Sequence, residues 1–598
     1  MGHQGSRHGQ KRRALCASER GQVDGPGGAA SDPGQWTSRD DQASEEASCS
    51  LEEFAAIEVN KLVHTARKKN TGSQRCSADR ERLCRIPASA RLGPGVSTVK
   101  RVFATLCTAN WQIATTGLKV RRVHAGFFGP KLGNASLPLP GAYTHRMDLL
   151  DSLFRSAAVD AVFSDRATLQ GMLDFEAALA RAESRAGVMP AETAAAIAAQ
   201  CKAELFDHAA LAQGAARAGN LAIPLVKQLT TLVAAKNKEA ARFVHWGATS
   251  QDAVDTGRVL QLRKALELLE GDLNGLVESL ATLAEQHRAT LIAGRTWMQH
   301  ALPTTLGVKI AAWLDALLRH RQRLEETGNR CLVLQFGGAV GTLAALGSRG
   351  PEVAKALAAE LKLGLPRLAW HSNRDRITEI GATLGMLAGT VGKIARDLAL
   401  HMQTEVAEIL EPAEEGRGGS STMPHKRNPV SCAVMLGAAL RVPALVAGLL
   451  ASMMQEDERG LGGWHAEWEP LPEIVQLTAG ALHHLATIAP KLEIDVERMK
   501  KNLDLTDGLI YAEAVSMALA EKMTRAEAHE IVQSACARAV RERRNLRDAL
   551  SADPKITGRL SAAELDRLFD PRKYLGAAEE YVRRVVAASR TALSERRE

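Results

Sequence analysis

A leucine-rich seam in the middle of the chain constrains the fold more than any other feature. Apolar residues recur there at alternating spacings of three and four, at Val259, Leu262, Leu266, Leu269, Leu273, Leu276, Leu280 and Leu283. Such a narrow apolar stripe is typical of one long helix that packs along its neighbours in a bundle. A second long helix repeats the pattern at Leu302, Leu306, Ile310, Leu314 and Leu318. Because seams of this length often pack between chains, we expect a homo-oligomer built on a central bundle.

The composition agrees with an all-α fold. Alanine and leucine abound among the 598 residues, whereas aromatic residues make up only 4%, and this balance favours helices over strands. The helical patterns begin at Met147, and the helices shorten from about Ile510. We predict an N-terminal extension, an N-terminal helical domain, a central long-helix domain and a small C-terminal helical domain, at residues 1–146, 147–257, 258–509 and 510–598.

The extension carries the positive charge of the chain. Residues 1–146 hold 22 Lys and Arg against 12 Asp and Glu, a net charge of +10, so the rest, with 54 against 56, carries −2. A basic tail can bind nucleic acid, but this one lacks the interleaved aromatic residues of a single-strand binder. Its acidic residues also disfavour a transit peptide. We expect a disordered segment, or one read from an incorrect start codon upstream of Met147.

Cysteine spacing and hydropathy argue against several protein classes. The nine cysteines include no C-x-x-C pair, so neither a zinc site nor a disulfide framework is indicated. The longest apolar stretch, 433–454, carries Arg441 and Pro443, so we interpret it as a buried core helix and not as a membrane span. Without a recognisable signal peptide or membrane segment, the cytoplasm is the expected compartment.

Three polar segments interrupt the helical patterns. The longest is a loop at 418–429, GGSSTMPHKRNP, between a helix expected over 397–410 and another that begins at Val430. The other two, TSQD at 249–252 and GRTWMQH at 294–300, each precede a long helix. Free amides and the helix dipole at a helix start favour a bound anion, although N-capping explains either segment alone. The three segments could converge at one end of the bundle.

The loop carries a recognisable motif. Its pattern Gly419-Ser420-Ser421-x-Met423-Pro424-x-Lys426-x-Asn428-Pro429 resembles the signature of the fumarase/aspartase superfamily, and the other two polar segments are similar to that superfamily's two further characteristic segments. Within the superfamily, the chain most resembles the bacterial 3-carboxy-cis,cis-muconate cycloisomerases, on stretches that include FEAALARA at 175–182, WHSNRDR at 370–376 and GWHAEW at 463–468. The resemblance implies a three-domain all-α fold, a tetramer with a twenty-helix core, active sites shared by three subunits, and no metal or organic cofactor.

The resemblance also implies roles for individual residues. Ser420 matches the catalytic acid or base; Lys426 and the loop amides would stabilise its alkoxide, and Asn428 would bind a substrate carboxylate. The residues expected to hold the substrate are His245, Thr249, Ser250, Arg295, Thr296, Trp297, Gln299, Ser421, Met423 and His425. The identity of a second acid or base stays open among His300, His371 and His465.

Trp297 narrows the expected reaction. Lyases of the superfamily commonly have histidine at this position, whereas the cycloisomerases resemble this chain in having tryptophan. In lactonisation the nucleophile is the substrate's own carboxylate, which is ionised at neutral pH because the pKa of such a group is about 4, so no general base is needed. Trp297 would pack against the diene, or simply against a helix. We expect an intramolecular lyase that closes 3-carboxy-cis,cis-muconate, a small tricarboxylate, to 4-carboxymuconolactone in protocatechuate degradation.

Three other functions remain open from the residues alone. One is an intermolecular lyase of the adenylosuccinate lyase type, which would release fumarate. Another is a catalytically silent structural protein of the same fold. The third is nucleic-acid binding through the basic extension, which would be salt-sensitive.

Overall fold

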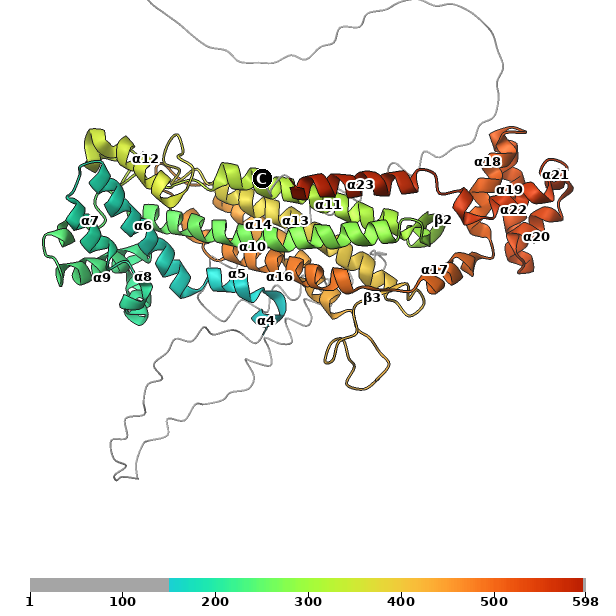
Figure 1. Cartoon of the computed structure of the whole chain (residues 1–598), viewed down its shortest axis with the longest axis horizontal. Coiled ribbons are helices and arrows are strands. Elements are labelled where there is room, and N and C mark those ends of the chain that lie inside the picture. Colours follow the sequence, from blue (N-terminus) through green and yellow to red (C-terminus); the bar gives the residue numbers. More distant parts are fainter. Residues whose placement is uncertain (1–149, 595–598) are drawn as a thin grey trace, which may run out of the picture. The chain divides into compact units, whose positions relative to one another are not determined.

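The computed structural model describes residues 150–594, which belong to the second of two compact units, residues 137–598 (Figure 1). The predicted extension at 1–146 and its junction at Met147 lie outside the described residues. Within the described part, helices dominate and four short strands occur. The prediction of an all-α fold is therefore confirmed, with two small β-ladders added to it.

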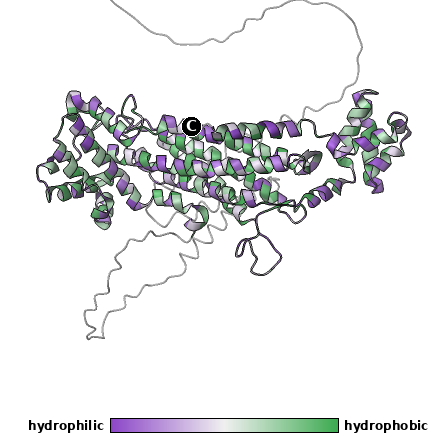
Figure 2. Cartoon of the chain, viewed as in Figure 1, coloured by the Kyte–Doolittle hydropathy of each residue, from purple (hydrophilic) through white to green (hydrophobic). Residues whose placement is uncertain are grey.

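Five long helices form the core. They pack along one another (Figure 1) and are α10 (Ser250–Gln286), α11 (Leu306–Cys331), α13 (Asp375–His401), α14 (Val430–Ser452) and α16 (Pro470–Ile488). The predicted leucine seam lies on α10, and all its members except the partly buried Leu283 are buried. Burial of each such side chain contributes roughly 1.5–3 kcal/mol to stability. Figure 2 shows many hydrophobic residues along the helices of the bundle.

Further helices lie beside these five, and some of them contact α10. They are α4 (Asp151–Phe154), α5 (Ala157–Val162), α6 (Asp165–Arg185), α7 (Ala191–Ala198), α8 (His208–Ala218), α9 (Ala222–Ala234) and α12 (Gly350–Leu361). Among them α6 contacts α10, α7 and α12. Its apolar face, which includes Met172, Phe175 and Leu179, is buried against α10, so this helix links the peripheral helices to the bundle.

The chain after residue 495 forms a second cluster and then returns to the bundle. Helices α18 (Ala512–Ala520), α19 (Arg525–Glu542), α20 (Leu546–Ser551), α21 (Pro554–Thr557) and α22 (Ala562–Leu568) share their own apolar core, and α17 (Val496–Leu503) precedes them. The last helix, α23 (Ala578–Ser594), instead packs on α10 and α11, where Val582 and Val586 are buried. The three boundaries between the four predicted segments stay predictions.

The prediction of a helix from Leu302 is wrong. Residues 291–305 form an antiparallel hairpin of β1 (Leu291–Thr296) and β2 (Gln299–Thr305), and α11 begins only at Leu306. Pro303 lies within β2, where it is paired with Ala293. The spacing of Leu302 and Leu306 matched a helical period, but two residues four apart cannot distinguish a helix from a strand that runs into one.

The helix predicted over 397–410 ends early. The helix α13 stops at His401, and Ile409–Leu410 forms β3, which pairs with β4 (Glu493–Ile494). The break turns Glu408 inward, where its fully buried carboxylate accepts hydrogen bonds from His401, Arg295 and Asn502. A buried carboxylate is tolerated only with such partners, so this cluster explains why the helical pattern is interrupted here.

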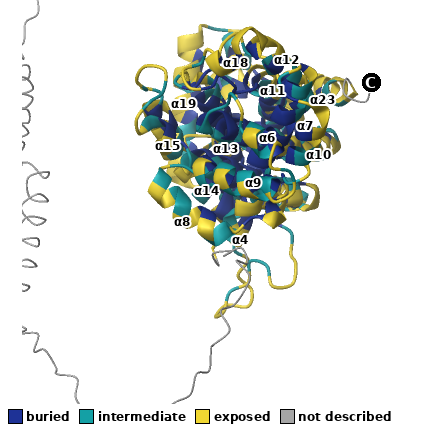
Figure 3. Ribbon diagram, turned by 90° about the vertical axis from the view of Figure 1, so that its left-hand side faces the viewer, coloured by how far each residue is buried: buried dark blue, intermediate teal, exposed yellow. Residues whose placement is uncertain are grey.

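Helix α14 is buried on one face only. It begins at Val430 as predicted and contains Pro443, and Cys432, Met435 and Val442 are fully buried. Leu440 and Leu450, however, are 75% and 54% exposed, so the prediction of a buried core helix holds for one face (Figure 3). Among the described residues, α14 is the one helix long and apolar enough to cross a membrane by length and composition, a test that core helices also pass.

Candidate active site

The motif loop leaves the bundle between β3 and α14 (Figure 1). In this loop the Ser420 Oγ accepts hydrogen bonds from the backbone amides of Met423, at 3.0 Å, and Thr422, at 3.3 Å. Two amide donors on one hydroxyl oxygen stabilise negative charge there more than on a free serine, because they favour the alkoxide. The expected contribution of the loop amides therefore has a geometric basis.

The neck of the loop is closed by Gly418 and Asn428. The Asn428 amide donates to the Gly418 carbonyl at 2.8 Å, and its Nδ2 donates to the Gly419 carbonyl at 3.3 Å. The backbone of Gly418 has φ +65°, and a Cβ there would lie 2.7 Å from the Asn428 carbonyl oxygen, so only glycine fits. Asn428 thus holds the loop in shape in addition to the substrate-binding role predicted for it.

Buried and charged groups anchor the base of the loop. The Glu411 carboxylate accepts from the amides of Ser431 and Cys432, at 3.1 and 2.9 Å, and so caps the start of α14. Arg427 donates to both carboxylate oxygens of Glu493, at 2.8 and 2.9 Å. These contacts fix both ends of the loop while residues 421–427 between them are exposed.

The remaining predicted loop residues point to solvent. Within residues 150–594 the side chains of Met423, His425 and Lys426 form no hydrogen bond or ion pair, and the Ser421 hydroxyl contacts only that of Thr422, at 3.5 Å. The expected contact of Lys426 with Ser420 is therefore not made in this loop conformation. The roles assigned to these residues stay predictions.

The polar segment at 294–300 contains the turn of the β1–β2 hairpin and is not the start of a helix. Trp297 and Met298 form the turn with φ of +51° and +67°, and Thr296 and Gln299 pair on either side of it. Left-handed backbone costs roughly 1–2 kcal/mol per non-glycine residue. Sequence reasoning missed the turn because such turns favour Asn-Gly and not two bulky residues. The Trp297 side chain is 96% exposed, so it packs against no helix within the described residues, and both roles expected for it stay predictions.

Arg295 is engaged within the chain. Its guanidinium binds both oxygens of Glu408 at 2.9 Å, an ion pair between β1 and the segment that leads into the loop. Burial works against ionisation of Glu408, but the hydrogen bonds of His401 and Arg295 outweigh it and lower its pKa to about 2. The opposite strand carries His300, whose pKa is lowered by burial and by Arg295. Arg295 could bind substrate only if its ion pair with Glu408 opened.

The polar segment at 249–252 lies at the start of α10, as predicted. Thr249 precedes the first helical residue, Ser250, and the Thr249 amide donates to Asp252 at 3.0 Å in a capping box. Arg459 donates to the Thr249 hydroxyl at 2.5 Å. N-capping therefore accounts for part of this segment, as the simpler interpretation held, and substrate binding by Thr249 and Ser250 stays a prediction.

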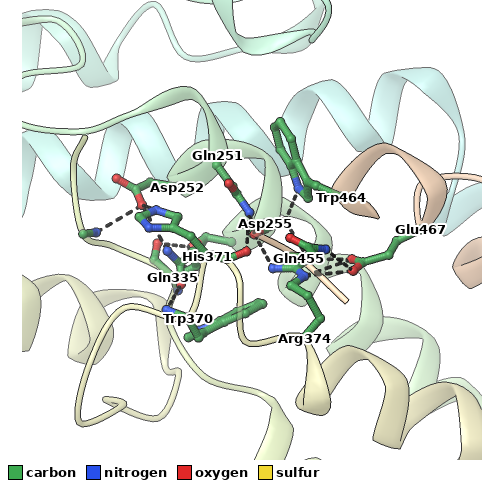
Figure 4. A network of polar contacts seen from close by, with 12 residues as sticks. Gln251, Asp252, Asp255, Gln335, Trp370, His371, Arg374, Gln455, Trp464 and Glu467 are labelled. Atoms are coloured by element: carbon green, nitrogen blue, oxygen red, sulfur yellow. Dashed lines mark hydrogen bonds and ion pairs between the residues drawn. The ribbon is translucent and has the colours of Figure 1, made fainter. Parts of the chain in front are cut away.

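A buried polar network holds the start of α10 in place (Figure 4). The carboxylate of Asp252 is fully buried and accepts from His371 Nε2 at 2.7 Å and from the amides of Gly337 and Gly338 at 3.1 and 2.9 Å. One turn further, Asp255 binds Arg374, which also binds Glu467. His371 therefore supports the helix start and lies 3% exposed, which argues against it as the second acid or base.

His465 makes a structural contact as well. It lies on the short helix α15 (Gly463–Ala466), its Nε2 is 2.9 Å from the Gly219 carbonyl oxygen, and its ring contacts the rings of Trp464 and Trp468. Gly219 directly follows α8, so this contact joins α15 to the peripheral helices.

The three polar segments do not converge within one chain. The helix α10 has 37 residues, which at 1.5 Å each is about 55 Å, with Thr249 at its start and the hairpin of Trp297 just beyond its end. The Arg295–Glu408 pair ties the hairpin to the base of the motif loop, so these two segments share one end of the bundle. The expectation of convergence at one end is therefore wrong for a single chain.

A second buried pair includes Glu176, a residue that the sequence analysis did not assign. His245 donates from Nδ1 to Glu176 at 2.6 Å, and Glu176 is a fully buried carboxylate on α6. The signal for Glu176 was a charged residue among the apolar positions of FEAALARA, and the signal for Asp252 was its capping-box spacing from Thr249. Among the described residues, no group of three or more His, Cys, Asp and Glu side chains is placed to hold a metal ion.

Comparisons with known proteins place this geometry in a family. Residues 155–444 match the lyase family model, and residues 508–585 match the model of the adenylosuccinate lyase C-terminus. The 3-carboxy-cis,cis-muconate cycloisomerase of Pseudomonas aeruginosa is 58% identical over 439 residues, which cover 73% of this chain and 96% of the relative.

Solved structures agree with these matches. The crystal structure of the 3-carboxy-cis,cis-muconate lactonizing enzyme from Pseudomonas putida superposes with a TM-score of 0.71 at 54% identity, covering 74% of this chain and 99% of that one. A fumarate lyase from Mesorhizobium superposes with a TM-score of 0.67 at 40% identity, covering 73% and 98%. The chain therefore belongs to the fumarase/aspartase superfamily of lyases, and within it to the family of the 3-carboxy-cis,cis-muconate cycloisomerases.

Proposed function

We propose that this protein closes 3-carboxy-cis,cis-muconate to 4-carboxymuconolactone as an intramolecular lyase. Relatives with the corresponding name match over almost their whole length at 58%, 56% and 52% identity, which favours this reaction over fumarate release by an intermolecular lyase. Ser420, Lys426 and Asn428 are all present, which counts against a catalytically silent protein. We place the reaction in the cytoplasm and expect it to need no added metal or organic cofactor.

The observation that carries the mechanism is the pair of amides on the Ser420 hydroxyl. One substrate carboxylate oxygen attacks the diene and forms the new C–O bond, and the electron pair moves to the adjacent carbon and into the carboxylate beside it. Ser420 then gives its proton to that carbon. The two amides hold the resulting alkoxide until it takes a proton from water.

We infer that several copies of the chain complete each active site. Thr249 and the Trp297 hairpin lie at opposite ends of the long helix α10, so they can serve one substrate only if different subunits supply them. Exposed apolar side chains on the bundle, Leu440 and Leu450, are available to bury in such an assembly. A homotetramer is the expected form, to be checked by size-exclusion chromatography with light scattering.

Mixed oligomers test the shared site directly. Ser420→Ala and His245→Asn alter residues at opposite ends of the bundle, and each variant alone is expected to lose most activity. Co-expression should restore activity, because some sites then draw both intact residues from different chains. Mixed oligomers that form but stay as inactive as either parent would contradict the shared site.

The reaction itself is tested by ultraviolet absorbance. The full-length protein should consume the absorbance of 3-carboxy-cis,cis-muconate, and the Ser420→Ala variant should do so far more slowly. Fumarate release from adenylosuccinate, measured in parallel, would instead support the intermolecular alternative. A wild-type protein that leaves the muconate unchanged would refute the proposed function.

A further inference from the structure

A short bond joins a buried carboxylate to an imidazole just before α10. His245 Nδ1 lies 2.6 Å from Glu176 Oε1, and the side chains of His245 and Glu176 are only 15% and 1% exposed. Because Nδ1 is used in this bond, Nε2 is the ring nitrogen left for a ligand; within the described residues it makes no hydrogen bond. The pair resembles other buried carboxylate–imidazole pairs in which the carboxylate fixes the ring's tautomer and orientation.

The backbone at His245 is held in a strained conformation. Its φ is +60°, a left-handed value that non-glycine residues adopt at a cost of about 1 kcal/mol or more. Strain of this kind persists only where the surrounding structure imposes it, and it gathers at functional positions. His245 lies four residues before Thr249, so the strained turn presents the imidazole beside the start of α10.

We propose that Glu176 is a positioning residue that holds His245 as an imidazolium, so that Nε2–H donates to a carboxylate of the substrate. This role rests on the proposed function. It adds to the site a residue of α6, which lies outside the three polar segments. The charged carboxylate is what distinguishes this role from simple packing: a neutral acceptor would orient the ring but would not keep its second proton.

The charges around His245 favour this state. Burial of the imidazole opposes protonation, but the charge and hydrogen bond of Glu176 on α6 and the charge of Asp252 on α10 outweigh it and raise the pKa of His245. Arg459, which donates to the Thr249 hydroxyl, is a cation at the same helix start. The imidazolium therefore persists to higher pH than in an ordinary histidine.

A matched control lies on the same helix. Glu183 is two turns after Glu176 on α6, also fully buried, and neither of its carboxylate oxygens has a hydrogen-bond partner among the described residues. Burial and the charge of Glu176 raise its pKa to about 9, so it is uncharged at neutral pH. Glu176→Gln removes a charge from the pair, whereas Glu183→Gln replaces a neutral acid with a neutral amide of the same shape.

The activity experiment compares pH profiles of kcat/KM for muconate consumption. A charge-assisted hydrogen bond is stronger than a neutral one by enough to change an equilibrium about tenfold. The Glu176→Gln substitution should therefore lower kcat/KM about tenfold near pH 8. The loss should fall on KM more than on kcat and shrink towards pH 6, and Glu183→Gln should follow the wild type. In a His245→Asn background, Glu176→Gln should have no further effect. A profile for Glu176→Gln that parallels the wild type would overturn the proposal.

A second measurement does not depend on activity. Because the folded pKa of His245 is raised, the stability that the pair contributes is fully present below the unfolded histidine pKa of about 6.5 and is lost as pH rises through the folded value. The difference in urea midpoint between wild type and Glu176→Gln should therefore shrink on raising the pH, and this trend should vanish in His245→Asn. If the wild type fails to turn over the muconate, the proposed function fails while this test still decides the dyad. A difference that does not change with pH would overturn the dyad.

Discussion

Replacing Arg374 with methionine should destabilise the protein by about 3–5 kcal/mol. Arg374 is 2% exposed and lies between two carboxylates (Figure 4), with bonds of 2.7 and 3.2 Å to Asp255 and of 2.7, 3.0 and 3.1 Å to Glu467. Its guanidinium also lies over the Trp370 ring, 4.8 Å from the centroid. Methionine retains the length but leaves two buried carboxylates facing each other without a cation, and that uncompensated charge is the source of the loss.

The measurement is the urea midpoint of the purified variant at pH 7, with the slope checked against the wild type. Arg330→Met serves as the control, because Arg330 binds Glu379 at 2.6 and 2.8 Å with more than half of its side chain exposed. Exposed pairs contribute at most about 1 kcal/mol. Equal losses for Arg330→Met and Arg374→Met would refute the reasoning.

A triple variant separates charge from packing. Adding Asp255→Asn and Glu467→Gln to Arg374→Met removes both stranded charges while keeping the side-chain shapes. Burial already raises the pKa of Glu467 against the opposing effect of Arg374, so this carboxylate should be the first to take up a proton when Arg374 is lost. The triple variant should therefore regain much of the loss. A triple variant no more stable than Arg374→Met would show that packing, and not charge, dominates.

Three further outcomes follow from other contacts. Ser420→Ala should lower kcat by at least about a hundredfold without lowering the unfolding midpoint, and activity within tenfold of wild type would contradict its role. Glu183→Gln should stabilise the protein by up to about 4 kcal/mol at pH 7.5, since a carboxyl group with its pKa raised to about 9 costs stability as pH rises above 4.5; equal midpoints at pH 5 and 8 in both proteins would refute this. Glu408, with a pKa lowered to about 2, contributes stability above pH 4.5 that is lost as pH falls towards 2, so acid titration should close the gap between wild type and Glu408→Gln.

Local patterns in the sequence were enough for much of the architecture. The leucine seam of α10 recurs at the period of a packed helix, and that period depends only on residues a few positions apart. The start of α10 could be placed from the spacing of Thr249 and Asp252, because a capping box is also a local device. The motif loop likewise identified the superfamily, since its residues are contiguous in the chain.

Contacts between distant residues could not be foreseen in this way. Arg295 was expected to bind substrate, but its partner Glu408 lies 113 positions later, and only the folded chain brings the two together. The same holds for His245 and Glu176, which are 69 positions apart. A charged residue in a sequence does not reveal which opposite charge it will meet, because burial and packing choose the partner.

The sequence by itself determined the helical bundle, the helix start at Thr249 and the reactive loop of Ser420, because each depends on neighbouring residues. Only the tertiary structure decided that the Trp297 segment is a hairpin turn and that Thr249 lies about 55 Å from it along α10. The physical reason is the rigidity of that helix: 37 residues of continuous hydrogen bonding keep its ends apart, so segments that look like one site in sequence order cannot meet within one chain.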